Sequence, residues 1–200
     1  MKKYAEDEIL IFLEALNKHL SKKTELILIG GTAAVLAYHV SLRTKDVDTV
    51  NSISEIAGAI KKANSATGLN VIVETVGVYD APYEWESRQI ILPLKLDKLI
   101  VKVPEIHDLI LMKTVRCFEH DLAMIDEMCH KNSVKSTVLL TRYMKEMKHL
   151  IMPQNKIRLN FLAMIERCFD KKVLKKVEVQ ISKSNNPVEI NKNKTRRGRK

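Results

Sequence analysis

Apolar residues near the start of the chain recur at the spacing of one helical face: Ile9, Phe12, Leu13, Leu16 and Leu20. This spacing predicts an amphipathic helix over residues 5–20. Residues 25–29 form a short, almost entirely apolar run, which is typical of a strand buried on both faces. The run stops at Gly30-Gly31, and strong helix formers resume at residues 32–39. The pattern predicts a strand, a tight glycine turn and a helix.

Polar and apolar residues alternate over residues 46–50, which predicts a second strand. Alternation sends Asp46 and Asp48 to one face of the strand and Val47 to the other, into the core. The Cα atoms of the two aspartates are then about 6.5 Å apart. Both carboxylates can therefore converge on one ligand.

The next stretch continues the alternation of helix and strand. Ser52 stands three residues before Glu55, which is the pattern of a capping box and predicts a helix at about 53–63. Runs rich in apolar and β-branched residues predict strands at 71–76, 88–92 and 99–103, the last two paired across a turn near Asp97-Lys98. From Pro104 the periodicity is helical to about residue 170, with breaks near 131–133 and at Pro153.

These elements define a fold class and a division of the chain. We predict an α/β (α+β) fold with a mixed sheet, flanking helices and a helical C-terminal region. We expect a first domain at 1–130, a helical extension at 131–170 and a basic, disordered tail at 171–200.

Composition excludes several classes of protein. The 200 residues are 46% hydrophobic and 29% charged, as in a globular chain with one substantial core. No run approaches the eighteen or so apolar residues of a membrane helix, so we expect a cytoplasmic protein that does not enter the membrane. Cys117, Cys129 and Cys168 are odd in number, which disfavours a disulfide scaffold. On one continuous helix Cys117 and Cys129 lie about 120° apart, which disfavours zinc.

Basic charge is concentrated at the end of the chain. The formal net charge is +10, and residues 170–200 carry 11 Lys and Arg against 3 Asp and Glu, whereas residues 1–169 carry 23 against 21. Six basic side chains lie within residues 192–200, enough to follow a phosphate backbone without reading its sequence. The tail is expected either to contact RNA or to act only as a solubilising segment.

The glycines and the residues around them suggest a phosphate site. Gly30 and Gly31 let the backbone approach a triphosphate without a Cβ clash, and the helix that follows offers free N–H groups. Thr32 can add a hydroxyl group there. Arg43 and Lys45, just before the acidic strand, can offset polyphosphate charge.

Asp46 and Asp48 have the chemistry of magnesium ligands, because Mg²⁺ prefers carboxylate, phosphate and water oxygens. Nucleotidyl transfer uses two such ions about 4 Å apart, which clamp the attacking and leaving oxygens. Taken singly, a Gly-Gly pair is most often only a turn, and an Asp-x-Asp pair is most often a solvated strand face. Their order along the chain favours one joint phosphate and metal site.

Two further groups of residues leave alternatives open. Lys113 and Arg116, three apart on a predicted helix, either contact phosphate or form a solvated basic face paired with Asp108 or Glu119. Residues 79–85 hold two tyrosines and a tryptophan, which either stack on a base or, as is more common, close an edge of the core.

Two motifs in order resemble a known superfamily. Ile29-Gly30-Gly31-Thr32-Ala33 followed by Arg43-Thr44-Lys45-Asp46-Val47-Asp48 resembles the first motif of the DNA polymerase beta-type nucleotidyltransferases, most closely the minimal branch that includes AbiEii-type bacterial toxins. That branch has a later helix of the form Pro-x-x-x-Asp-Leu-x-x-x-Lys, followed by an Arg and spaced Asp residues. The matching residues here are Pro104, Asp108, Leu109, Lys113, Arg116, Asp121 and Asp126. The resemblance covers roughly residues 24–130.

The resemblance implies a nucleotidyltransferase-type fold that uses a nucleoside triphosphate with Mg²⁺ or Mn²⁺. It implies transfer of a nucleotidyl group to RNA, tRNA in particular, or to a protein hydroxyl. It further implies a toxin of a toxin–antitoxin or phage-defence system, with a cognate antitoxin protein as partner. The expected domain at 1–130 is the part of the chain that would carry this activity.

The family's metal site has a third carboxylate on a later strand, which serves as the base toward the attacking hydroxyl. Glu74 is the candidate on such a strand, whereas Asp80 is expected in a loop and Asp97 in a turn. If no third carboxylate joins Asp46 and Asp48, the alternative is a catalytically weak or inactive module that binds a nucleotide or a partner protein.

Overall fold

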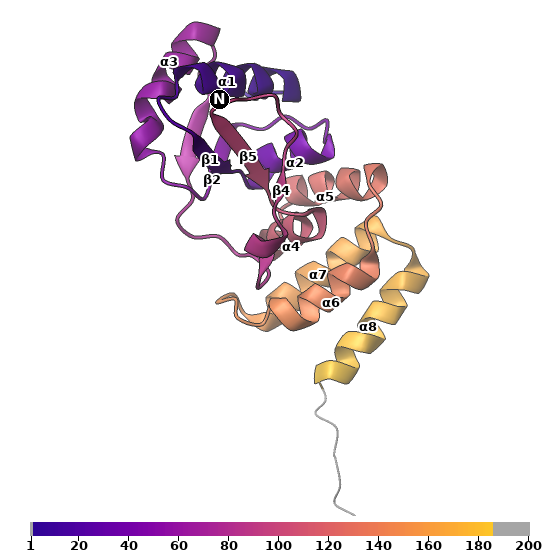
Figure 1. Ribbon diagram of the computed structural model, residues 1–200. Helices are drawn as coiled ribbons and strands as arrows, with labels where there is room; N and C mark the ends of the chain where they lie inside the picture. The colour runs from indigo at the N-terminus through magenta and orange to yellow at the C-terminus, as the bar shows by residue number, and fades with distance from the viewer. Residues whose placement is uncertain (1, 186–200) are drawn as a thin grey trace, which may run out of the picture.

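Strands and helices alternate in the first half of the computed structural model, which describes residues 2–185 (Figure 1). The elements of this half are α1 (Glu6–His19), β1 (Thr24–Ile27), α2 (Gly30–Tyr38), β2 (Asp46–Thr49), the 3₁₀ turn η1 (Ser54–Ile56), α3 (Ala57–Thr67), β3 (Ile72–Thr75), the 3₁₀ turn η2 (Trp85–Arg88), β4 (Ile90–Ile91) and β5 (Leu99–Val103). Five helices follow: α4 (Ile106–Arg116), α5 (Glu119–Lys131), α6 (Ser136–Glu146), α7 (Gln154–Cys168) and α8 (Lys171–Asn185).

The strands form a small mixed sheet. β1 and β5 are parallel, β4 is antiparallel to β5, and β2 and β3 are parallel. A single antiparallel bridge between Leu28 and Thr49 joins the two pieces, and the Ile29 N–H donates to the Asp48 carbonyl at 3.0 Å beside it. The strands therefore run in the order β3-β2-β1-β5-β4. The predicted fold class, a mixed sheet with flanking helices and a helical C-terminal region, is confirmed.

The core of the α/β half lies on one face of the sheet. The apolar stripe of α1 is buried there, and α1 packs against α3. In β2 only the inward residues Val47 and Thr49 are fully buried, while both aspartates stay partly open. The alternation of β2 therefore separates a core face from a face free to carry chemistry.

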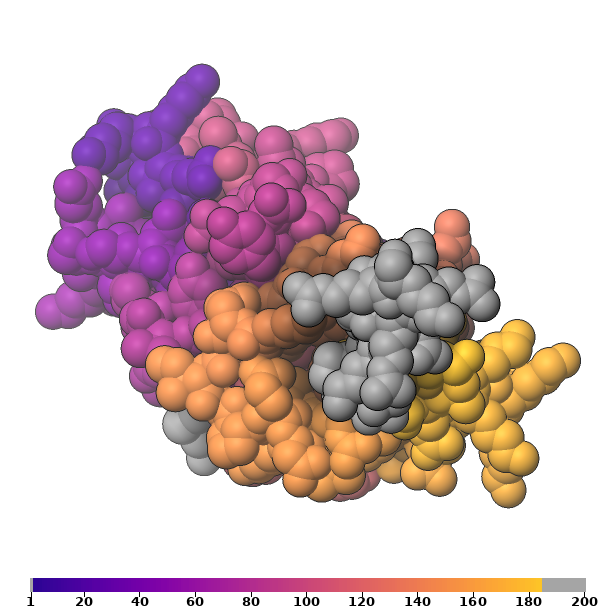
Figure 2. Space-filling model, turned by 90° about the horizontal axis from the view of Figure 1, so that it is seen from below, coloured from indigo at the N-terminus to yellow at the C-terminus, as the bar shows by residue number. Residues whose placement is uncertain are grey.

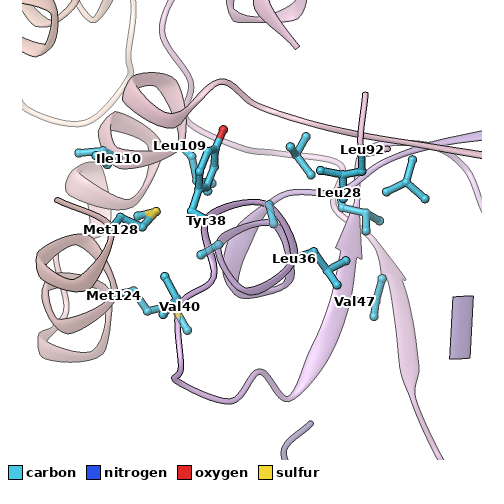
Figure 3. Close-up of a cluster of buried hydrophobic side chains, with 14 of the residues drawn as sticks. Leu28, Leu36, Tyr38, Val40, Val47, Leu92, Leu109, Ile110, Met124 and Met128 are labelled. Atoms are coloured by element: carbon cyan, nitrogen blue, oxygen red, sulfur yellow. The ribbon is translucent and has the colours of Figure 1, made fainter. Parts of the chain in front are cut away.

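Helix α2 lies between the sheet and the helices α4 and α5 (Figure 3). Leu36 faces Leu28 and Val47 on the strand side, whereas Val40 lies near Met124 on the other side. All five side chains are buried, and α2 has an apolar surface all round, as expected for a helix enclosed by neighbours. Contacts with β2 on one side and with α4 and α5 on the other hold the start of α2 against β2.

The helices α6, α7 and α8 gather at the end of the molecule away from α1 and α3 (Figure 1). They form the near face in the view from below (Figure 2). Tyr143 of α6 stacks on Phe161 of α7 with ring centroids 4.1 Å apart, and Phe161 is fully buried. Within residues 2–185, no helix is both long enough and apolar enough to cross a membrane.

The prediction of an unbroken helix from Pro104 to the break near residues 131–133 is wrong at Cys117, which adopts a left-handed conformation with φ of 53° and ends α4. No glycine occupies the end of α4. Contacts with α7 stabilise the left-handed conformation of Cys117 instead. The Asn160 side chain donates to the Val115 carbonyl at 2.8 Å, and the Cys117 thiol contacts the Asn160 carbonyl. Cys117 and Cys129 therefore lie on either side of a helix break. The separation of about 120° expected for them on one continuous helix does not apply.

The expectation of a disordered tail from residue 171 is wrong for residues 171–185, which form α8. The Asp170 side chain accepts a hydrogen bond from the Val173 N–H and so caps the helix, while Val177 and Ile181, one turn apart, are buried. Apolar spacing therefore outweighs the high lysine content. The basic segment 192–200 lies outside the described residues.

A buried ion-pair network ties the two halves together. Asp108 of α4 is fully buried and accepts two hydrogen bonds from Arg88, at 2.8 and 2.9 Å. Arg142 of α6 lies 2.9 Å from the same carboxylate and also pairs with Glu105. Arg88 reaches Glu146 of α6 at 2.6 Å. Two guanidinium groups thus compensate one buried carboxylate, and they hold η2, α4 and α6 together.

We predict that Asp108→Ala lowers the free energy of unfolding by about 3 kcal/mol, because it leaves Arg88 and Arg142 without their buried partner. Urea denaturation measures the change. Glu55→Ala, which removes a carboxylate from an exposed pair with Lys22, is the control and is expected to leave the free energy of unfolding nearly unchanged. Equal losses for the two variants would contradict the structural role of the network.

Candidate functional site

A cavity of about 750 Å³ opens where the start of α2, strand β2 and helix α4 meet. Of the nine predicted site residues, all within the described range, seven line it: Gly30, Gly31, Arg43, Asp46, Asp48, Lys113 and Arg116. Thr32 and Glu74 are the two that do not. The fold therefore brings together residues that lie more than 80 positions apart in the sequence.

Gly30 and Gly31 form the first turn of α2 rather than a turn before it. Gly30 has φ of +66°, and a Cβ atom there would lie 2.7 Å from Oδ2 of Asp48. A Cβ atom on Gly31 would lie 2.8 Å from Oγ1 of Thr44. Gly30 is thus required both by its backbone conformation and by the space that the Asp48 carboxylate occupies.

Asp46 and Asp48 point from the same face of β2 into the cavity, as their alternation predicts. Burial, together with the negative charges of Asp46 and Glu74, raises the pKa of Asp48 to about 6. Such a shift indicates excess negative charge in a partly desolvated place. The donor set, two carboxylates with open space before them, suits a divalent cation.

Glu74 lies directly opposite Asp48 in the parallel register of β2 and β3. Residues in register on neighbouring strands share a face, and the effect of Glu74 on the pKa of Asp48 agrees with that placement. Glu74 is exposed and stands beside the cavity. Within residues 2–185, no group of three His, Cys, Asp or Glu side chains is placed so that it could hold a metal ion.

Lys113 and Arg116 form a basic wall opposite the two aspartates. Their partner is Asp121 of α5, rather than Asp108 or Glu119 as considered from the sequence. Asp121 is fully buried; it accepts two hydrogen bonds of 2.8 Å from Arg116 and lies 3.4 Å from Nζ of Lys113. Burial would raise its pKa, but Arg116 and Lys113 hold the pKa of Asp121 below its ordinary value.

The Lys113 ammonium group is almost fully buried, and burial lowers its pKa. The negative charges of Asp121 and Asp48 oppose that effect, whereas Arg116 adds to it. Lys113 is therefore held between two carboxylates. A buried cation in this position can bind an anionic ligand without much loss of hydration.

Thr32 and Arg43, which were also predicted to contact phosphate, are placed differently. The Thr32 hydroxyl is buried and donates to the Asp46 carbonyl at 2.6 Å, so it fastens α2 to β2. Arg43 lines the cavity, but its guanidinium group lies at the rim, where it donates to the Lys3 carbonyl and lies 3.6 Å from Glu8. Thr32 supports the site, and Arg43 borders it.

The cavity also contains residues that were not predicted as site residues. His120, in the first turn of α5, lines it next to Lys3 of the N-terminal segment. Burial and the charge of Lys113 lower the pKa of His120. Its position depends on the break at Cys117, for which the sequence gives no glycine signal. Val76, Val78, Tyr79 and Asp80 form a further wall, described below.

The arrangement has a definite chemical character. Two carboxylates with a local excess of negative charge face a lysine and an arginine across one cavity, next to a helix start that carries two glycines. Such a site can hold a divalent cation on one side and the phosphates of a nucleotide on the other. Together with the small mixed sheet, it defines a site of the nucleotidyltransferase class.

Comparison with known families agrees with this assignment. Residues 8–175 match the model of a family described as a nucleotidyltransferase of unknown function (DUF6036), and the chain belongs to this family. No curated protein and no solved structure matches the chain. The prediction of a nucleotidyltransferase is confirmed at the level of the family.

We predict two effects of Gly30→Ala. The fold loses about 1–2 kcal/mol of stability, because alanine is strained in the left-handed conformation of residue 30. Magnesium binding weakens roughly tenfold, because the added Cβ atom displaces the Asp48 carboxylate. Calorimetric titration with Mg²⁺ and a urea unfolding curve measure the two effects.

Gly58→Ala is the matched control, since nothing lies within 4 Å of a Cβ atom there and α3 continues through it. We expect it to stabilise the protein by about 0.5–1 kcal/mol. If Gly30→Ala binds Mg²⁺ as the wild type does, the close approach of Gly30 to Asp48 has no role in shaping the site.

Proposed function

We propose that the protein transfers a nucleotidyl group from a nucleoside triphosphate to a hydroxyl group of RNA, tRNA in particular, or of a protein. The observation that carries this proposal is the cavity in which Asp46 and Asp48 face Lys113 and Arg116. Family membership supports nucleotidyl transfer in general, and the specific acceptor is part of the proposal.

Asp46 and Asp48 would hold Mg²⁺, or Mn²⁺ in its place, which when bound neutralises phosphate charge and activates the attacking oxygen. Lys113 and Arg116 bind phosphate oxygens of the triphosphate. The acceptor oxygen forms a bond with the α-phosphorus, and the bond from that phosphorus to the bridging oxygen breaks. Pyrophosphate leaves with the electron pair, close to the basic wall that compensates its charge.

Glu74 takes the proton of the acceptor hydroxyl in this proposal. Support comes from its position opposite Asp48 and from its exposure, which leaves it accessible to a macromolecular acceptor. A carboxylate beside the metal ligands can act as a general base without being a ligand itself. The third acidic group expected from the resemblance would then serve proton transfer.

The physiological setting is proposed from the resemblance to AbiEii-type toxins. In that setting the protein modifies tRNA or a protein as a toxin of a toxin–antitoxin or phage-defence system, and a cognate antitoxin protein restrains it. The excess of basic residues in 170–200, 11 Lys and Arg against 3 Asp and Glu, supports an RNA acceptor, because counterion release favours binding of a basic segment to a phosphate backbone.

We predict magnesium-dependent transfer of label when the protein is incubated with α-³²P-labelled triphosphates, total RNA and cell lysate. The double variant Asp46→Asn, Asp48→Asn is expected to lose this labelling, since amides bind Mg²⁺ far more weakly than carboxylates. Gel separation of RNA and protein identifies the acceptor class.

The control is Asp7→Asn with Glu14→Gln, which changes the net charge equally on the exposed side of α1. Labelling that survives in the Asp46, Asp48 double variant would rule out the proposed site. Triphosphate binding by calorimetry, with no product under any condition, would instead support a module that binds nucleotide without turnover.

We predict that Glu74→Gln lowers the transfer rate about 100-fold while triphosphate affinity stays within about threefold, because the amide cannot accept the proton. Single-turnover kinetics and calorimetry separate the two quantities. Glu25→Gln makes the same change on β1, where Glu25 pairs with Lys102, and is expected to leave the rate unchanged. An unchanged rate in Glu74→Gln would exclude Glu74 as the base.

A further inference from the structure

The cavity has a second wall of different chemistry, formed by the segment that follows β3. Val76, Val78 and Tyr79 supply apolar surface there, and Asp80 supplies one carboxylate. Val78 is 89% exposed, although it is a large apolar residue. Together with Val76 and Tyr79, it gives the cavity an apolar wall next to its charged groups.

Tyr79 is held firmly in this wall. Its ring meets Trp85 edge to face, with centroids 5.4 Å apart and planes at 84°. Trp85 is only 5% exposed and is buried with Ile29 and Ala81. Trp85 therefore closes an edge of the core, which is one of the two roles that the sequence left open for these aromatic residues. Tyr79 packs on that edge and also faces the cavity.

The segment is anchored on its far side as well. Arg88 donates to the Tyr83 carbonyl at 3.0 Å while it binds the buried Asp108, and the Tyr83 N–H donates to the Glu146 carbonyl at 3.0 Å. The aromatic wall is thus fixed by α4 and α6 as well as by β2, because the Val76 N–H donates to the Thr49 carbonyl at 2.8 Å. A rigid aromatic surface loses little entropy when a ring stacks on it.

The size of the cavity fits a nucleotide. About 750 Å³ is within the range of small-molecule sites, and the charged groups occupy only part of the lining. Phosphates and a cation account for Asp46, Asp48, Lys113 and Arg116. Neither the phosphates nor the cation matches the apolar surface of Val78 and Tyr79, so that wall has no ligand of matching chemistry in the proposed function.

We propose that Val78 and Tyr79 bind the nucleobase of the incoming triphosphate, and that Asp80 accepts a hydrogen bond from its exocyclic amino group. This inference rests on the proposed function and names the part of the substrate that the second wall recognises. Aromatic rings stack on any base, so Tyr79 supplies affinity. A carboxylate only accepts hydrogen bonds, and uracil has a carbonyl oxygen where adenine and cytosine carry their amino group, so Asp80 at that position favours adenine or cytosine over uracil.

Calorimetry with Mg²⁺ and three ligands tests the inference: ATP, UTP and inorganic tripolyphosphate. We expect Tyr79→Leu to bind ATP about tenfold more weakly than the wild type and tripolyphosphate equally well, since only ATP has a base to stack. Tyr79→Phe keeps the ring and is expected to bind ATP as the wild type does. Asp80→Asn is expected to reduce the preference for ATP over UTP.

Tyr83→Leu is the matched control, because Tyr83 is an exposed aromatic residue four positions on that does not line the cavity. Trp85, the only tryptophan of the chain, provides a second readout. Its fluorescence is expected to change on titration with ATP and to stay constant with tripolyphosphate, because Tyr79 contacts its ring.

The outcomes separate this inference from the proposed function. ATP binding that is unchanged in Tyr79→Leu, or an equal loss of ATP and tripolyphosphate binding, would overturn the base-binding role while the phosphate site stands. Binding of neither ligand by the wild type would overturn both. Thermal unfolding of each variant shows whether a loss of affinity reflects a loss of fold.

Discussion

The candidate site depends on the close approach of the start of α2 to β2. Gly30 leaves the space that the Asp48 carboxylate fills, and a side chain at that position would displace it. The Thr32 hydroxyl and the Ile29 N–H bind backbone carbonyls of β2 at Asp46 and Asp48. These contacts hold two like-charged carboxylates on one strand face, an arrangement that their mutual repulsion would otherwise disfavour. The backbone of α2 thus fixes the acidic side of the cavity before any ligand binds.

The basic side of the cavity is fixed by Asp121. This buried carboxylate binds Arg116 through two hydrogen bonds and lies next to Lys113, so both cations are oriented without neutralising Asp46 or Asp48 directly. Excess negative charge remains around Asp48, and a desolvated ammonium group stands across the cavity. In the proposed function, a divalent cation bound to a polyphosphate would relieve both conditions at once, with the cation at the carboxylates and the anion at Lys113 and Arg116. This arrangement of charge supports the proposal that the two bind together.

Local patterns predicted the acidic side of the site well and the basic side only in part. Alternation in residues 46–50 was sufficient to place Asp46 and Asp48, because strand periodicity has a fixed phase. The break at Cys117 depends on Asn160, more than 40 residues away, so no local pattern reveals it. The pairing of Lys113 and Arg116 with Asp121 follows from that break. Likewise, the sequence did not predict α8. Its many lysines are typical of a disordered segment, and the helix is stabilised by the burial of Val177 and Ile181 against the rest of the fold.

The helices after α5 contribute to the site although they carry none of the predicted site residues. Arg142 of α6 pairs with Asp108, and Glu146 of α6 pairs with Arg88. Arg88 in turn donates to the Tyr83 carbonyl and so anchors the segment that carries Tyr79. Asn160 of α7 holds the end of α4, from which Lys113 and Arg116 project. A cavity built from the sheet alone would lack both its basic wall and its aromatic wall. The match of one family model to residues 8–175 agrees with this dependence, because the matched region includes α6 and α7.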